Sequence, residues 1–141
     1  MTSSTVLIQP LVALILWSFL MWLWMYATRI PAISRMKIKM DPNIPSATQM
    51  AQLPANVRWK ADNYNHLMEQ PTVFYALVLA LTVLGETSTT AIYAAWSYVI
   101  LRIIHSLVQA IGNNIIRRFG VFVLSNIPLT ALMIFAIKAT Y

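Results

Sequence analysis

The sequence predicts an all-α integral membrane protein in which four transmembrane helices form one bundle. Of its 141 residues, 59% are apolar and only 10% are charged, which lies outside the usual range of soluble domains. A helix needs about 20 apolar residues to cross roughly 30 Å of hydrocarbon. Runs of this kind occupy residues 6–27, 91–111 and 119–137, and a shorter run occupies residues 71–84. We expect a single domain over residues 1–141, because no repeat divides the chain.

The first span, at residues 6–27, is expected to be a retained helix. A signal peptide places positive charge before a shorter apolar core, whereas the opening MTSSTVLIQP has no charged side chain. The aromatic residues of this span suit contact with lipid or with the membrane interface. They are Trp17, Trp22, Trp24 and Tyr26.

The second span must bring polar residues into the membrane. Its apolar part reaches only about 21 Å at roughly 1.5 Å per residue, so the helix is expected to cover residues 60–84. It is expected to begin soon after Pro54, because proline suits a first helical turn, and to stop at Gly85. The polar segment DNYNHLMEQ therefore enters the bundle.

The third and fourth spans are expected at residues 91–111 and 119–137. Thr89 or Thr90 is expected to cap the third span. Gly112 and Gly120 are expected to bracket the turn before the fourth span, in which Pro128 introduces a kink.

The net charge of +6 reports membrane topology and not a nucleic-acid partner, because the basic residues are sorted by loop. Eight of the ten lie between the first two spans or between the last two: Arg29, Arg35, Lys37, Lys39, Arg58, Lys60, Arg117 and Arg118. The positive-inside rule makes these two connections cytoplasmic and places both termini outside the cytoplasm. The chain has no cysteine, which excludes disulfides and thiolate metal sites.

Two polar stripes are expected to face each other where the second and third spans pair as a hairpin. Helical spacing groups Asp62, Asn65 or His66, and Glu69 on the second span. The same spacing groups Arg102, His105 or Ser106, Gln109 and Asn113 on the third span. A turn between residues 84 and 91 sets Glu69 level with His105, His66 level with Gln109, and Asp62 level with Asn113.

Ionisable groups inside a bilayer are costly unless they find partners. We therefore predict a charge-assisted pair between Glu69 and Arg102. The pair is expected to lie in a polar cavity of the cytoplasmic half, open toward Arg117 and Arg118, that attracts an anion. The alternative is that the same polar groups only hold the helices together. Metal binding is not predicted, because the two histidines and Glu69 lack a second carboxylate at matching depth.

Two motifs resemble the MAPEG family, the membrane-associated proteins in eicosanoid and glutathione metabolism. They are DNxxHLxExPxxFYAL in the second span and RxxHS in the third, followed by the basic pair Arg117 and Arg118. The resemblance covers essentially the whole chain and is closest to an uncharacterised bacterial branch. It implies a homotrimer of four-helix bundles in a bacterial inner membrane, with glutathione bound between subunits near the cytoplasmic face.

The resemblance also implies roles for individual residues. Arg118 matches the arginine that activates the thiol of glutathione, although a one-residue shift would nominate Arg117. The residues implied to hold glutathione are Glu69, His66, Asn65, Arg102, His105 and Gln109. Eicosanoid-branch enzymes carry arginines at the positions of Asn65 and Asp62 and an aromatic hydroxyl at that of Gln109, so this chain departs from their pattern.

These observations leave two function classes open. The first is a membrane glutathione transferase or peroxidase that acts on lipophilic electrophiles from the bilayer. The second is a non-catalytic, lipid-binding or partner-organising membrane trimer, which Asp62, Asn65 and Gln109 favour. A third possibility is that the cavity binds another small anion, such as a different low-molecular-weight thiol.

Overall fold

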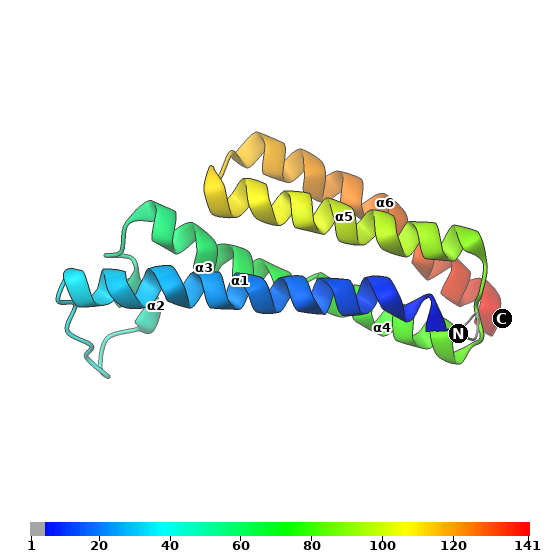
Figure 1. The fold of residues 1–141 in the computed structure, drawn as a ribbon, viewed down its shortest axis with the longest axis horizontal. Coiled ribbons are helices and arrows are strands. Elements are labelled where there is room, and N and C mark those ends of the chain that lie inside the picture. The colour runs from blue at the N-terminus through cyan, green and yellow to red at the C-terminus, as the bar shows by residue number, and fades with distance from the viewer. Residues whose placement is uncertain (1–4) are drawn as a thin grey trace.

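The computed structural model describes residues 5–141, which form six α-helices and no strand. The helices are α1 (Ile8–Arg35), α2 (Ser46–Met50), α3 (Ala55–Leu67), α4 (Pro71–Val83), α5 (Thr89–Ile111) and α6 (Ile115–Thr140). Four helical segments are long and apolar enough to cross a membrane, with α3 and α4 together forming one of them. The long helices run along a common direction, with the start of α1, the α4–α5 connection and the end of α6 at one end (Figure 1). The predicted all-α membrane fold with four spans is therefore confirmed.

Helix α1 buries one stripe of its surface and exposes the rest. Leu11, Leu14, Met21 and Met25 are buried, and their spacing of three, four and seven places them on one face of a helix. The helix continues to Arg35 instead of ending near residue 27, and it includes Pro31. Arg35 lies in the last turn of α1, where a positive charge interacts favourably with the negative end of the helix dipole.

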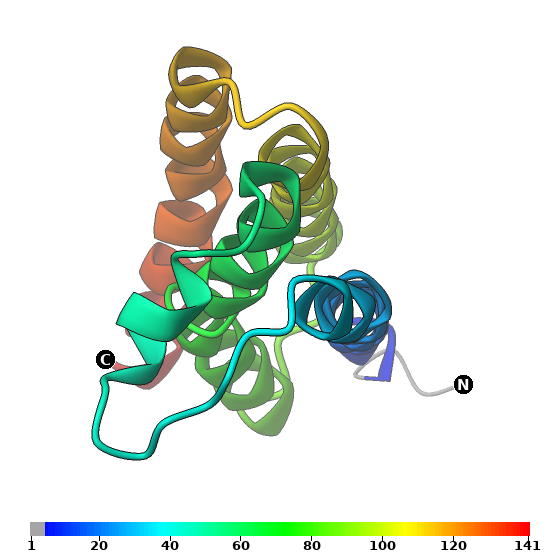
Figure 2. The same ribbon diagram turned by 90° about the vertical axis from the view of Figure 1, so that its left-hand side faces the viewer.

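The long connection between α1 and α3 is organised by one buried amide. Gln49 of α2 donates from Nε2 to the carbonyls of Asp41 and Ile44 at 2.8 and 2.7 Å, and its Oε1 accepts from the Asp41 N–H at 2.8 Å. These bonds hold the loop after α1 in a fixed conformation next to α2. Figure 2 shows this connection as a loop at the end of the bundle, leading from α1 to the short α2. Helix α3 begins directly after Pro54, as predicted.

The caps of α5 and α6 differ from the predicted ones. Ser88, one residue before the expected threonines, accepts a hydrogen bond from the N–H of Ala91 at 3.3 Å and caps α5. The Ser88 N–H also donates to the Glu86 carboxylate at 2.7 Å, and the hydrogen bonds from Ser88 lower the pKa of Glu86. Gly85, with φ of +76°, ends the preceding helix as predicted.

The prediction that Gly120 closes the turn before the last span was wrong. The Asn114 side chain accepts from the Arg117 N–H at 3.0 Å and starts α6 at Ile115, so Gly120 lies inside the helix. The basic pair therefore belongs to the first turn of α6.

The bundle has an apolar half and a polar half. At the start of α4, Phe74 stacks on Tyr98 with 4.5 Å between ring centroids, and closer to the α4–α5 connection Leu81, Ala91 and Ala95 are fully buried. Toward the other end, the buried side chains of α3 and α5 include five polar ones: Asn63, Arg102, His105, Ser106 and Gln109.

Candidate functional site

Arg102 of α5 is the centre of the polar half. Its side chain is fully buried, and Nη2 donates to Nδ1 of His66 at 2.8 Å and to the His66 carbonyl at 3.3 Å. Because an arginine can only donate, His66 is neutral here with its proton on Nε2. The Nε and Nη1 groups of Arg102 are buried without a hydrogen-bond partner among the described residues. A buried guanidinium with two free donors is suited to bind an anion.

A break in the second span makes the His66 carbonyl available to Arg102. Pro71 has no N–H, and its ring clashes with the carbonyl four residues earlier, so the helix stops at Leu67 and resumes at Pro71. Within the break the His66 carbonyl accepts from the Glu69 N–H at a long 3.4 Å and also accepts from Arg102. Proline breaks in membrane helices persist because neighbouring groups satisfy the freed backbone.

Two histidines and one phenylalanine surround the guanidinium. The ring centroids of His66 and His105 lie 4.7 Å apart. The Phe122 ring of α6 is edge-on to His66 at 5.5 Å and tilted against His105 at 6.1 Å, both measured between ring centroids. The Arg102 guanidinium lies 5.7 Å from the centre of the Phe122 ring. This shell lowers the local polarity, which strengthens any charge interaction that Arg102 makes.

The two candidate arginines on α6 differ in burial and in their partners. Arg118 is partly buried and donates from Nη1 to Asn113 Oδ1 at 2.8 Å. Arg117 is exposed. Gln109 is buried and its Oε1 has no partner among the described residues.

The predicted ion pair between Glu69 and Arg102 was wrong for the single chain. Among residues 5–141 Glu69 forms no ion pair and is exposed, because the break turns this residue out of the helix face that carries His66. Arg102 and His105 are buried under their neighbours, and the predicted opening of a cavity toward Arg117 and Arg118 stays a prediction. Asp62 and Asn65 lie on another side of α3, where they line a cavity with Arg29.

The predicted hairpin register was off by about one helical turn. His66 lies beside Arg102 and His105 and not level with Gln109, and Asn63 donates to Ser106 at 2.6 Å. Helix α5 starts at Thr89, before the expected residue 91, so the turn is shorter and its centre lies earlier in the chain.

A second polar network crosses the break, and the sequence interpretation did not include it. Tyr98 donates to Gln70 Oε1 at 3.4 Å, and Gln70 donates to Asn126, whose own amide donates to the Phe122 carbonyl at 3.0 Å. The available signal was Asn126, an amide in the middle of an otherwise apolar span. Within the described chain no group of three His, Cys, Asp or Glu residues is arranged to hold a metal ion.

This arrangement defines an integral membrane four-helix protein with a buried cationic cluster on its second, third and fourth spans. The chain belongs to the MAPEG family, whose family model matches residues 7–138. Comparisons with curated proteins and with solved structures gave no match.

Proposed function

We propose that this protein is a membrane-bound glutathione transferase or peroxidase that acts on lipophilic electrophiles dissolved in the bilayer. Membership of the MAPEG family supports this proposal, and the observation that carries it is the buried guanidinium of Arg102 with two free donors. A buried cation without an anionic partner is destabilising, so its presence favours a binding role over a purely structural one.

The cluster offers complementary groups for a peptide thiol that carries carboxylates. Arg102 donates its free N–H groups to a carboxylate of glutathione, and His66 and His105 supply further hydrogen bonds. Arg118 stabilises the thiolate, which lowers the thiol pKa from its ordinary value of about 8.5. The thiol proton is released to water, the sulfur forms a bond to the electrophilic carbon, and the leaving group departs with the electron pair.

Glu69 takes its role from assembly in this proposal. An exposed carboxylate in the middle of a membrane span is costly against lipid. A homotrimer with binding sites between subunits would cover Glu69 and give it polar neighbours. Gln109, with its free Oε1, completes the set of groups that contact the tripeptide, whereas Asn65 lies on the other side of α3 and is left out.

The experiment compares thiolate formation and conjugation in Arg118→Gln and Arg117→Gln. With an apolar aryl halide as electrophile, we expect the Arg118 variant to lose at least about tenfold in conjugation rate, equivalent to about one unit of thiol pKa. The ultraviolet absorbance of bound thiolate should fall in parallel, while the Arg117 variant keeps both. Equal loss in the two variants, or no loss in either, would contradict the role of Arg118.

The second candidate is a non-catalytic, lipid-binding or partner-organising trimer. The hydrogen bond between Asn63 and Ser106 favours it, because this bond joins α3 to α5 without any ligand. This function predicts that Glu69→Ala disperses the assembly in native mass spectrometry while Arg118→Gln leaves every measurable property unchanged.

A further inference from the structure

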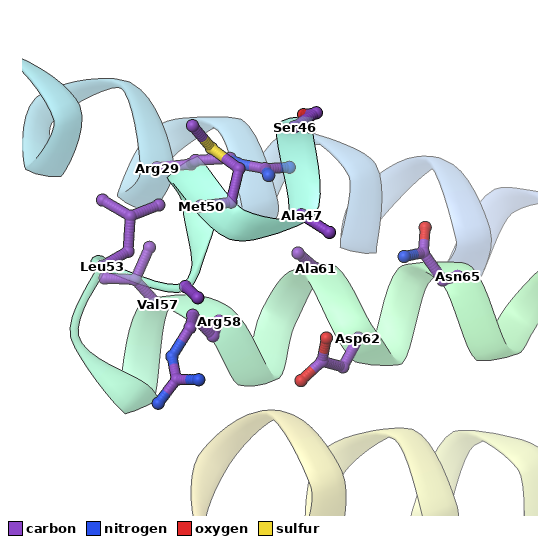
Figure 3. A pocket seen from close by; sticks show the side chains of 11 residues that line it. Arg29, Ser46, Ala47, Met50, Leu53, Val57, Arg58, Ala61, Asp62 and Asn65 are labelled. Atoms are coloured by element: carbon purple, nitrogen blue, oxygen red, sulfur yellow. The ribbon is translucent and has the colours of Figure 1, made fainter. Parts of the chain in front are cut away.

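A cavity of about 380 Å³ lies between α1, α2 and α3, away from the cationic cluster. Its polar lining comes from Arg29 of α1 and from Arg58, Asp62 and Asn65 of α3, and its apolar lining includes Met50 of α2. Figure 3 shows Arg29 reaching from α1 toward Met50, Asn65 directed toward α1, and the side chains of Arg58 and Asp62 next to each other. The volume falls at the lower end of the range of about 300–1,000 Å³ for small-molecule sites.

The charged groups of this cavity have no partner in the described chain. Arg29, Arg58, Asp62 and Asn65 make no side-chain hydrogen bond and no ion pair there, although Arg58 and Asp62 lie one helical turn apart with opposite charges. The lining therefore combines two cations with one carboxylate and one amide. A ligand that matches it carries an anion and a hydrogen-bonding cation a few atoms apart.

The position of the cavity indicates where such a ligand comes from. It lies at the end of the bundle that carries α2 and the basic connection (Figure 2), and Lys60 nearby sits 5.0 Å over the Trp24 ring. Tryptophan and basic residues mark the level of lipid headgroups in membrane proteins. Met50 and other apolar residues of the lining suit the glycerol and first acyl carbons of a lipid.

We propose that this cavity binds a phosphate ester that bears a primary ammonium group, supplied by a phospholipid with an ethanolamine headgroup. The phosphate is held by Arg29 and Arg58, and the ammonium donates to the Asp62 carboxylate and the Asn65 amide oxygen. A glycerol headgroup would leave Asp62 next to an anion without a compensating cation. A choline headgroup has no N–H to donate, so it cannot make the bonds to Asp62 and Asn65.

Native mass spectrometry of the full protein tests this assignment. The protein is equilibrated with equal amounts of phosphatidylethanolamine, phosphatidylcholine and phosphatidylglycerol that share the same acyl chains. We expect the ethanolamine lipid to be retained about tenfold more than either competitor, because a hydrogen bond to a charged group changes the affinity by about that factor. Equal retention of the three lipids, or preferred retention of phosphatidylglycerol, would overturn the proposal.

Variants assign the selectivity to the cavity. Asp62→Asn should lower retention of the ethanolamine lipid to that of the choline lipid, and Arg29→Gln should weaken retention of all three. Arg35→Gln, which removes a cation from the same helix outside this cavity, is the matched control and should keep the preference. Asp62 is exposed, so Asp62→Asn is expected to fold. This variant still tests the assignment if Arg29→Gln does not fold. A preference that survives in Asp62→Asn would refute the assignment of the ammonium.

Competition with soluble phosphoethanolamine distinguishes a membrane lipid from a dissolved metabolite. Failure of millimolar phosphoethanolamine to displace the bound lipid supports the lipid as the source. Displacement at micromolar concentration would overturn the lipid source. The site shares no lining residue with the cationic cluster, so glutathione binding can fail while this lipid preference persists, and the reverse.

Discussion

Arg102 is the residue on which the proposed function depends most, because two of its buried donor groups have no partner among the described residues. Among residues 5–141, Nη2 is the one guanidinium nitrogen of Arg102 with a hydrogen-bond partner, while Nε and Nη1 are buried without one. Structural polar pairs in membrane bundles join neighbouring helices, as the hydrogen bond from Asn63 to Ser106 joins α3 to α5. A half-satisfied charge persists in a protein when function requires it, since replacing buried ionic groups by apolar side chains is often neutral or stabilising.

Replacing Arg102 with methionine should therefore separate stability from binding. Arg102→Met removes a buried charge, and the group that loses its hydrogen-bond donor is the neutral His66. We therefore expect the midpoint of thermal unfolding to change by only a few degrees, or to rise. Saturating glutathione should raise the midpoint of the wild-type protein and leave that of the variant unchanged. A strongly destabilised variant that still responds to glutathione would assign Arg102 a structural role instead.

The sequence located most of the cluster but assigned one partner incorrectly. Helical spacing and the RxxHS motif identified Arg102 and His105, and the same stripe on the second span contained His66. Glu69 was expected to pair with Arg102, because helical spacing assumes a continuous helix. In the structure Glu69 lies in the break between α3 and α4, where that spacing does not apply. Phe122 was not predicted, because aromatic residues in apolar spans carry no positional signal.

At the scale of helices, the break between α3 and α4 determines which polar groups meet. It ends α3 at Leu67, exposes Glu69 and leaves the His66 carbonyl within 3.3 Å of Arg102. The network from Tyr98 through Gln70 to Asn126 then ties the start of α4 to α5 and α6. The sequence analysis predicted a helix start soon after Pro54 and treated residues 60–84 as one continuous span. The incorrect hairpin register followed from that simplification.

Restoring a continuous helix should disturb the site more than the fold. Pro71→Ala supplies the missing N–H and removes a residue that costs about 3 kcal/mol inside a regular helix. We expect slightly higher helicity by circular dichroism and glutathione affinity weakened about tenfold or more, because the His66 carbonyl returns to the helical pattern. Pro31→Ala, at an exposed position within α1, is the matched control. Unchanged affinity in Pro71→Ala would show that the break does not position the cluster.

At the scale of the whole molecule, the bundle separates an apolar half from a polar half that lies toward the basic connections. Composition and run length predicted the four spans, because the cost of exposing polar groups to lipid acts on every residue of a span. Contacts between subunits depend on how side chains on the bundle surface fit together, and composition and run length do not describe that fit.

The topology can be tested because the chain has no cysteine. Thr87→Cys and Ser46→Cys introduce single thiols at exposed positions in connections at opposite ends of the bundle. In intact cells we expect a membrane-impermeant maleimide to label position 87 at once and position 46 only after permeabilisation, because the positive-inside rule predicts that the basic connection is cytoplasmic. The reverse labelling pattern would contradict the proposed orientation.

Isothermal titration calorimetry of the purified, membrane-extracted protein with glutathione tests the central claim most directly, since the claim is that the buried cluster around Arg102 and Arg118 is a binding site. We predict saturable heat for the wild-type protein at glutathione concentrations up to millimolar, and at least about tenfold weaker binding for Arg118→Gln. The absence of heat from folded wild-type protein at millimolar glutathione, or equal affinity in the variant, would contradict it.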